Sequence, residues 1–268
     1  MTLDGKVAIV TGVTKRKGAG KAIAQRLAEQ GAAVAITGRQ TSLPGAEEIA
    51  EGFRHDGHRA IAVAADSTDP DQINAAVATV VAEFGGLDVL VNNAGIAGPS
   101  APVDEHDEDG WDKCIQVNLS GTFYMTRRAV PLLRQRGGGA IINISSTAAL
   151  HGYPLRSAYA ASKWAMMGLM KTWAMELGPE GIRVNAVCPT SVEGARIDAV
   201  IRRDAEQRGL PVEQVRDVYL RQTSMRTFVT PDDVADTILF LASDAASKIS
   251  GQSISVDGHT EGLSNWLD

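Results

Sequence analysis

The chain alternates short, β-branched apolar runs with longer segments of helical periodicity, and this alternation restricts its possible folds more than any other feature. A continuously apolar run is typical of a strand buried on both faces, and a helix between two strands joins parallel neighbours. The pattern predicts an α/β fold with seven parallel strands. We expect strands at 6–11, 34–37, 60–65, 89–92, 140–145, 184–188 and 253–256. We expect helices at 18–30, 47–54, 70–84, 111–134, 158–177 and 231–243.

Strands and helices in this order predict a doubly wound, Rossmann-like sheet with helices on both faces. The 268 residues suit one dinucleotide-binding catalytic domain over 1–268. In such folds ligands bind beyond the carboxyl ends of the strands, where the strand order reverses. The polar, arginine-rich segment 191–230 interrupts the alternation just after a strand, and we expect it to form a substrate loop or lid.

Composition and charge exclude several classes of function. A net charge of −6 gives no support to nucleic-acid binding. Cys114 and Cys188 have neither metal-ligand nor disulfide spacing, which favours a reducing, cytoplasmic compartment. The N-terminus has no signal-peptide pattern, and no apolar run approaches the roughly 20 residues of a membrane span, so no membrane association is expected. His55 and His58 lack a third partner, so no metal site is expected.

A glycine-rich turn follows the first expected strand, with Gly12, Gly18 and Gly20 leading into the next helix. Glycines there let the backbone approach a pyrophosphate at a helix N-terminus, where N–H groups favour anions. Glycine-rich turns are common in α/β proteins, so a turn without this role remains an alternative.

The end of the second expected strand bears on the choice of cofactor. An acid there would bind the ribose diol of NAD, but the residue that follows Thr37–Gly38 is Arg39. A guanidinium can pair with the 2′-phosphate of NADP. Further positive charge comes from 15–17, although a solvated basic loop would look the same. We expect NADP, with NAD as the alternative.

Tyr159 and Lys163 stand four residues apart at the start of a helix, so their side chains share one face. A free tyrosine, with a pKa of about 10, is a poor base at neutral pH, and a neighbouring ammonium favours the phenolate. Such a pair can exchange a proton with an alcohol or ketone. Ser146 ends the fifth expected strand and could hold the substrate oxygen, although a turn serine would also fit.

These residues stand among motifs whose joint order resembles the short-chain dehydrogenase/reductase family from Lys6 to Gly258. The motifs are TGVTKRKGAG at 11–20, Asp66, NNAG at 92–95, VNL at 117–119, ISS at 144–146, YAASK at 159–163, RVNAVCP at 183–189, GQ at 251–252 and VDG at 256–258.

The resemblance implies a hydride transfer between a nicotinamide cofactor and a secondary alcohol or ketone, close to 3-oxoacyl-carrier-protein reductases. Tyr159 would be the general acid/base, Lys163 would lower its pKa and bind the ribose, Ser146 would hold the substrate oxygen and Asn118 would kink its helix and support a proton relay. The cofactor-binding residues would be Gly12, Thr14, Lys17, Gly18, Gly20, Arg39, Asp66, Ser67, Asn92, Ala94, Gly95, Tyr159, Lys163, Pro189 and Val192.

Some positions depart from the family pattern. The first two loop glycines are separated by five residues rather than three, which is similar to the enoyl-reductase branch. That branch spaces its tyrosine and lysine more widely, so Tyr159 and Lys163 favour carbonyl chemistry. Thr190 and His259 stand where glycine is usual, and Gly194 stands where a threonine often binds the carboxamide.

Other interpretations stay open. A lyase such as a dehalogenase, or a non-catalytic cofactor sensor, could use this fold, but Lys163 and the glycine loop oppose the first and the intact Ser146, Tyr159 and Lys163 oppose the second. Several other residues could contact substrate or belong to turns and solvated faces; these are His151, Tyr153, Arg156, Arg196, Arg202 and Arg203. The resemblance also implies a homodimer or homotetramer, built on the helices that carry Trp111 and Tyr159.

Overall fold

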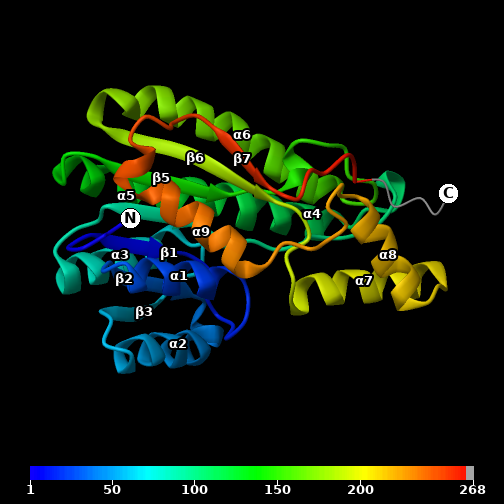
Figure 1. Cartoon of the computed structure of the whole chain (residues 1–268), viewed down its shortest axis with the longest axis horizontal. Helices are drawn as coiled ribbons and strands as arrows, with labels where there is room; N and C mark the ends of the chain where they lie inside the picture. Colours follow the sequence, from blue (N-terminus) through cyan, green and yellow to red (C-terminus); the bar gives the residue numbers. More distant parts are fainter. Residues whose placement is uncertain (264–268) are drawn as a thin grey trace.

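The core of the protein is a sheet of seven parallel strands in the order β3-β2-β1-β4-β5-β6-β7 (Figure 1). The computed structural model describes residues 1–263, so the last five residues of the expected domain lie outside the described part. The strands are β1 (Val7–Val10), β2 (Ala33–Gly38), β3 (Ala60–Ala64), β4 (Val89–Asn92), β5 (Gly139–Ile144), β6 (Ile182–Pro189) and β7 (Ser253–Val256). The predicted seven-stranded, doubly wound α/β fold is confirmed.

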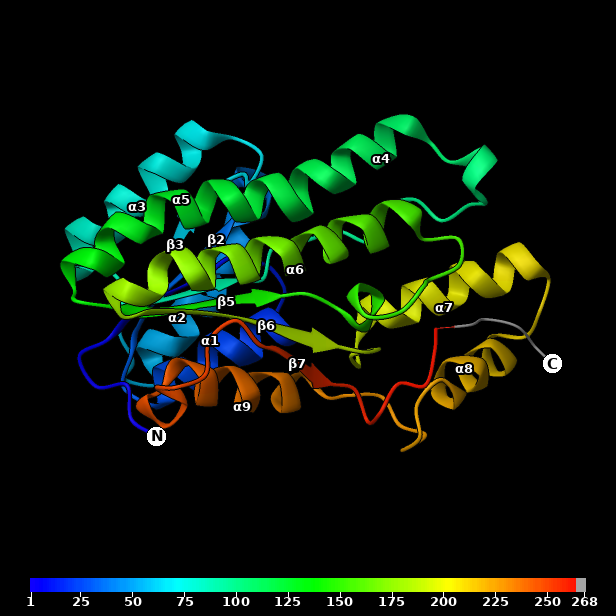
Figure 2. The ribbon, with the colours of Figure 1, turned by 90° about the horizontal axis from the view of Figure 1, so that it is seen from above.

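Helices cover both faces of the sheet (Figure 2). One face packs against α1 (Ala19–Glu29), α2 (Leu43–His55) and α9 (Pro231–Ala242). The other packs against α3 (Pro70–Phe84), α5 (Gly121–Gln135) and α6 (Ser157–Leu177). Strands β1, β2 and β4 are buried throughout because they lie between these two layers, which explains their unbroken apolar sequence.

Two helices differ from their predicted extents. The helix predicted at 47–54 begins four residues earlier, at Leu43, because Pro44 lies in its first turn, where a missing N–H costs nothing. The helix predicted at 111–134 begins at Glu108 as α4 (Glu108–Ile115), passes through a π-helical stretch over Gln116–Ser120 and continues as α5. Asn118 lies in this π-helical stretch, where the resemblance implied a kink.

The segment 191–230 is largely helical rather than an extended loop. Its helices α7 (Ala195–Arg208) and α8 (Val212–Arg221) project beyond the carboxyl edge of the sheet (Figure 1). They share a small apolar core that includes Ile201, Val215 and Phe228. At its base, Val192 and Val229 form an isolated parallel bridge. A second isolated bridge, Thr223 to Thr260, joins the segment to the residues that follow β7.

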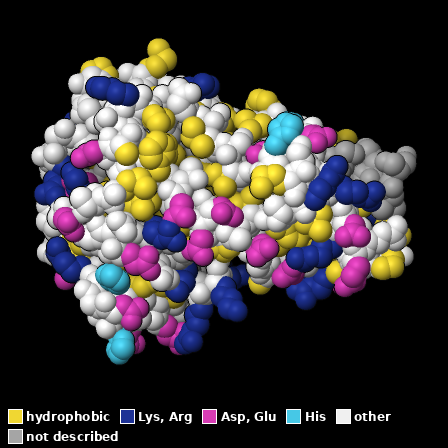
Figure 3. Space-filling model, viewed as in Figure 1, with side chains coloured by type: hydrophobic (Ala, Val, Ile, Leu, Met, Phe, Trp, Pro, Cys, Tyr) yellow, Lys and Arg dark blue, Asp and Glu magenta, His cyan; other side chains and the backbone are white. Residues whose placement is uncertain are grey.

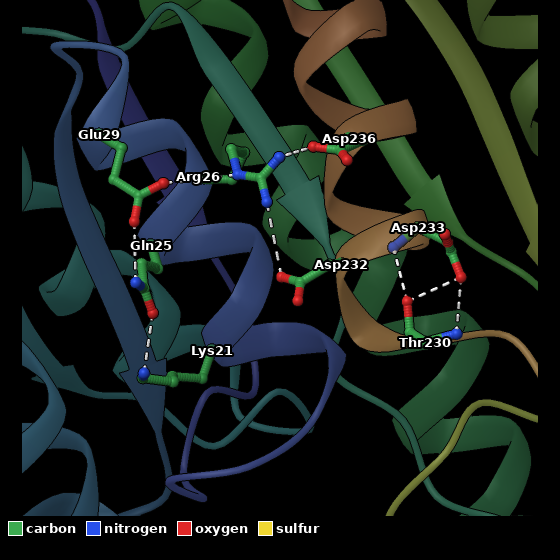
Figure 4. Close-up of polar contacts among 8 residues, drawn as sticks. All are labelled: Lys21, Gln25, Arg26, Glu29, Thr230, Asp232, Asp233 and Asp236. Carbon is green, nitrogen blue, oxygen red and sulfur yellow. Dashed lines mark hydrogen bonds and ion pairs between the residues drawn. The ribbon is translucent and has the colours of Figure 1, made fainter.

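Contacts between α1 and α9 fix the place where this segment returns to the sheet (Figure 4). Thr230 caps α9 by accepting a hydrogen bond from the Asp233 amide, and Asp233 in turn accepts from the Thr230 amide. Arg26 of α1 forms ion pairs with Asp232 and Asp236 in the first two turns of α9.

The surface carries interspersed acidic and basic side chains, including over the α7–α8 end (Figure 3). Across 1–263, no helix is both long and apolar enough to cross a bilayer. The same residues contain no group of three or more His, Cys, Asp or Glu side chains arranged to hold a metal ion.

Candidate active site

The site begins where the strand order reverses, between β1 and β4. Thr11 follows β1, and its hydroxyl accepts hydrogen bonds from the amides of Asn93 and Ala94, at 3.0 and 2.9 Å. The Asn93 side chain donates to the Thr11 carbonyl at 2.7 Å. These bonds join the two strand ends into one rigid edge. Both residues belong to sequence motifs, at 11–20 and 92–95, but neither was expected to be a site residue.

Two glycines of the loop after β1 are required by close packing. A Cβ on Gly12 would lie 2.7 Å from Ala94 Cα, and its φ of +72° is unfavourable for other residues. A Cβ on Gly20 would lie 2.7 Å from Asn93 Nδ2. The backbone can therefore approach Ala94 this closely only with glycine at residue 12, and a side chain at residue 20 would displace that of Asn93.

A groove of about 700 Å³ runs along this edge of the sheet. Eight of the expected cofactor residues line it: Gly12, Thr14, Arg39, Asp66, Ser67, Asn92, Ala94 and Gly95. The described residues expected there that do not line it are Lys17, Gly18, Gly20, Tyr159, Lys163, Pro189 and Val192. The groove has the size and position of a dinucleotide site at a topological switch point.

Several lining residues are held by their neighbours. Asp66 accepts hydrogen bonds from the amide and hydroxyl of Thr68, at 2.9 and 2.8 Å. The amide of Asn92 donates to Thr126 and Asn143, at 3.0 and 2.9 Å. Asn92 therefore lines the groove from a buried position, and its side-chain N–H groups hydrogen-bond to the protein interior rather than to the groove.

Two basic residues near the groove point to different places. Arg39 is exposed and lines the groove directly after β2. Arg16 instead turns to α2, where its guanidinium pairs with Glu48 at 2.9 Å. A Cβ on Gly38 would lie 2.6 Å from Thr14 Cγ2, so an acid has no room at this position.

Tyr159 and Lys163 lie together at the start of α6, as the sequence predicted. Lys163 is 4% exposed, and its Nζ lies 5.7 Å from the Tyr159 ring centroid. Nζ also donates to the Ile144 carbonyl at 2.8 Å, which ties the lysine to the end of β5. Burial lowers the pKa of Lys163. Burial opposes ionisation of the phenol, but the positive charges of Lys163 and Arg196 outweigh it, so the pKa of Tyr159 falls below its usual value.

Ser146 lies two residues beyond β5 and starts a short 3-10 turn, Thr147–Ala149. Its hydroxyl accepts a hydrogen bond from the Ala148 amide at 3.2 Å. Ser146 also favours the ionised form of the nearby Tyr159 phenol and so lowers that pKa further. The serine and the tyrosine are therefore neighbours in the site.

Asn118 connects the cofactor groove to this pair. Its fully buried side chain exchanges two hydrogen bonds with the backbone of Ile96, at 2.8 and 3.0 Å, and donates to Ser162 of α6 at 3.1 Å. A Cβ on Gly95 would lie 3.2 Å from Asn118 Oδ1 and 3.8 Å from Lys163 Nζ. The end of the groove and the Tyr159–Lys163 pair are thus adjacent.

The last two expected cofactor residues lie at the end of β6. Pro189 closes the strand, and Val192 pairs with Val229 at the base of the α7–α8 unit. Arg156, which was left open between substrate contact and turn, is buried beside the Tyr159 ring. The only sequence signal for it was its position three residues before the tyrosine.

Comparisons with known proteins agree with this geometry. A family model described as enoyl-(acyl carrier protein) reductase matches residues 12–260. The chain is 39% identical to a 3-oxoacyl-(acyl-carrier-protein) reductase of Thermotoga maritima, over 96% of this chain and 98% of that protein. It is 37% identical to a D-beta-hydroxybutyrate dehydrogenase of Rhizobium meliloti, over 94% and 97%.

A solved structure is similar over nearly the whole chain. It is the crystal structure of a candidate short-chain alcohol dehydrogenase from Sinorhizobium meliloti 1021, with a TM-score of 0.85, 33% identity and coverage of 96% of both chains. The sequence motifs, the parallel sheet and these relatives agree: the protein belongs to the short-chain dehydrogenase/reductase family of nicotinamide-dependent oxidoreductases.

Proposed function

We propose that this protein is an NADP-preferring reductase or dehydrogenase that interconverts a ketone and a secondary alcohol. The observation that carries the proposal is the position of Tyr159 beside the buried Lys163, at the end of a dinucleotide-sized groove and next to Ser146.

Tyr159 is the proton donor in reduction and the proton acceptor in oxidation. Lys163 keeps the phenol ionisable by its charge, and Ser146 holds the substrate oxygen with a hydrogen bond. Asn118 positions the chain after β4 through Ile96, and we assign it the support of a proton relay from Lys163 to solvent. These roles divide the work between proton transfer and stabilisation of charge on the oxygen.

The groove fits a nicotinamide dinucleotide. Gly12 lines the groove and would let the backbone approach a pyrophosphate, and the groove passes Asp66 and Ser67, which would hold the adenine end. Thr14, Lys17 and Gly18 belong to the phosphate loop, Asn92, Ala94 and Gly95 would line the middle of the cleft, and Pro189 and Val192 would flank the carboxamide. When bound, the nicotinamide ring supplies the hydride donor or acceptor.

The preference for NADP rests on Arg39. Its exposed guanidinium borders the groove just beyond β2, and the packing of Gly38 against Thr14 excludes an acid next to it. A guanidinium favours a 2′-phosphate, which an acid would repel. Fluorescence titration tests this: tighter binding of NADH than of NADPH would contradict it.

Reduction of a carbon–carbon double bond is a second candidate, favoured by the description of the matching family model and by the long loop between Gly12 and Gly18. The proximity of Ser146 to Tyr159 favours a carbonyl oxygen instead, because both hydroxyl groups could then bind the same oxygen atom. Crotonyl thioester and acetoacetyl thioester, assayed side by side with NADPH, separate the two reactions.

Tyr159→Phe is the main test. We expect kcat to fall by about 10²- to 10⁴-fold with an unchanged Kd for NADPH, because the proton donor is lost while the groove is intact. Tyr124→Phe is the matched control, since Tyr124 lies on α5 within the packing of α3, α5 and α6. Turnover that survives in Tyr159→Phe contradicts the mechanism.

We also propose a homodimer or homotetramer built on the outer faces of α4, α5 and α6. Trp164 and Met175 of α6 and Phe123 of α5 are large, apolar and exposed. Such side chains are typical of covered interfaces. Light scattering on the purified protein gives the oligomeric state, and a monomer would contradict this assignment.

A further inference from the structure

One buried cation near Tyr159 has no role in the mechanism above. Arg156 is the residue that precedes α6, and it is 7% exposed. Its guanidinium carbon lies 6.0 Å from the Tyr159 ring centroid and 5.8 Å from that of Tyr153. Within residues 1–263 its buried Nε has no hydrogen-bond partner. Burying an N–H donor without an acceptor is unfavourable, so Nε needs an acceptor that the described residues do not supply.

The nearest candidate carboxylate is already engaged elsewhere. Asp204 borders the same small cavity as Arg156, but its Oδ1 accepts from Arg208 Nε at 2.7 Å. The Tyr219 hydroxyl lies 3.4 Å from its other oxygen. Asp204 is therefore matched by its own partners rather than by Arg156.

A second cation acts on the same groups from the α7–α8 unit. Arg196 stands in the first turn of α7, and its positive charge favours the ionised form of Tyr159 and disfavours that of Lys163. Lys163, Arg196 and Arg156 all favour the ionised phenol by their charge. Three cations acting on one phenol leave an excess of positive charge on this side of the site.

We propose that Arg156, assisted by Arg196, binds a carboxylate of the substrate, so that the enzyme acts on short oxo acids and the corresponding hydroxy acids. This inference rests on the proposed carbonyl chemistry at Tyr159. A planar guanidinium fork matches a carboxylate, which it can bind through two parallel hydrogen bonds.

The geometry limits the size of the acid. The guanidinium and the phenol ring are only 6.0 Å apart, so the carboxylate and the carbonyl must be close neighbours in the substrate. A neutral thioester on a long acyl chain offers no charge at this place.

The first experiment compares acids with their methyl esters. Pyruvate, acetoacetate and levulinate, each paired with its methyl ester, are reduced with NADPH by the wild-type protein and by Arg156→Gln, Arg156→Lys and Arg196→Gln. We expect wild type to prefer at least one acid over its ester. Arg156→Gln should lower kcat/KM for that acid by about 10- to 100-fold, chiefly through KM, and leave the ester rate nearly unchanged. Arg156→Lys should recover part of the loss, and Arg196→Gln should lose less.

Arg202→Gln is the matched control. Arg202 is an exposed arginine on a different face of α7 from Arg196, so its loss should not change the ratio of kcat/KM for the acid to kcat/KM for the ester. If Arg156→Gln slows acid and ester equally, Arg156 only positions the start of α6, and the proposal is overturned. If wild type reduces acids and esters equally well, the carbonyl chemistry stands and the carboxylate site falls.

If the enzyme reduces none of these probes, a binding measurement tests the proposal instead. Calorimetric titration of acetoacetate and of methyl acetoacetate into the protein saturated with NADP⁺ reads anion recognition without turnover. Binding of the acid alone, weakened by Arg156→Gln, supports the carboxylate site even if the proposed reaction fails. Binding of neither probe, or of both equally, overturns it.

Discussion

The two halves of the site are built by different physical means. The cofactor half, at the ends of β1 and β4, is held by neutral hydrogen bonds from Thr11 and Asn93 and by backbone contacts that only glycine allows. The substrate half, at the ends of β5 and β6, depends on buried charges, above all Lys163 and Arg156. Close packing shapes the first half, whereas buried positive charge favours the ionised form of Tyr159 in the second.

This contrast has a consequence for mutations. Changes in the cofactor half should act on dinucleotide affinity and on stability together, because the same close contacts serve both. Changes in the substrate half should act on rate and on pH dependence, because the buried charges shift the pKa of Tyr159 without building the fold. The predictions below, from the largest expected effect to the smallest, test whether the two halves separate in this way.

Lys163→Met should remove the charge that keeps Tyr159 ionisable. We expect kcat for alcohol oxidation to fall by about 100-fold or more at neutral pH, with little change in melting temperature. Oxidation needs the phenolate, so the wild-type rate rises with pH up to the lowered pKa of Tyr159. Without the lysine that pKa rises, and the same limb of the profile must move to higher pH.

The control for this variant is Lys171→Met, which removes an exposed lysine from the same helix. Its pH profile should match that of wild type. A profile of Lys163→Met that keeps the wild-type midpoint would show that Lys163 does not set the ionisation of Tyr159, and the electrostatic account of this half would fail.

Gly12→Ala should break the cofactor half. The new Cβ would lie 2.7 Å from Ala94 Cα, and the alanine would have to adopt an unfavourable φ of +72°. We expect a loss of stability of about 2–4 kcal/mol, as the sum of backbone strain and overpacking, and a weaker Kd for NADPH. Chemical denaturation and fluorescence titration measure the two effects.

Gly5→Ala separates strain from packing. Gly5 has the same φ of +72°, but nothing lies within 4 Å of the added Cβ. It should cost only about 1–2 kcal/mol and leave NADPH affinity unchanged. Equal effects of the two substitutions would mean that close packing at Ala94 is not what requires glycine at residue 12.

Arg39→Asp should reverse the cofactor preference without touching the chemistry. An acid at the edge of the groove repels a 2′-phosphate and can accept from a ribose diol. We expect the Kd for NADPH to rise by about 10- to 100-fold and that for NADH to fall. Arg16→Asp serves as the control, because Arg16 points to Glu48 and should hardly alter the ratio. An unchanged ratio in Arg39→Asp would remove the case for NADP.

Thr230→Ala should have the smallest effect, because it lies in neither half. Losing the cap of α9 should cost about 1 kcal/mol of stability and leave both Kd and kcat near wild type. Thr237→Ala, in the middle of the same helix, should change the stability by less than about 0.5 kcal/mol. A large loss of activity in Thr230→Ala would show that the α7–α8 unit depends on this anchor.

Most of the fold could be predicted from local patterns. All seven strands and the six helices that cover the sheet were expected from periodicity and from glycine and proline positions, because each strand lies between two apolar layers. The errors are local. The helix expected at 47–54 begins at Leu43, with Pro44 in its first turn, and the π-helical stretch around Asn118 was not expected as an element of its own from periodicity. The segment 191–230 was polar enough to suggest a loop, although α7 and α8 bury a small shared core.

For the site, the sequence alone determined the fold class, the glycine positions and the pairing of Tyr159 with Lys163, because spacing of three or four residues on a helix places side chains together whatever surrounds them. Only the tertiary structure decided that Arg16 pairs with Glu48 while Arg39 borders the groove. It also decided that Asn118 hydrogen-bonds to Ile96 and that the buried Nε of Arg156 has no acceptor. Those outcomes depend on contacts between segments far apart in the chain, and burial and partner choice are properties of the packed whole rather than of any local pattern.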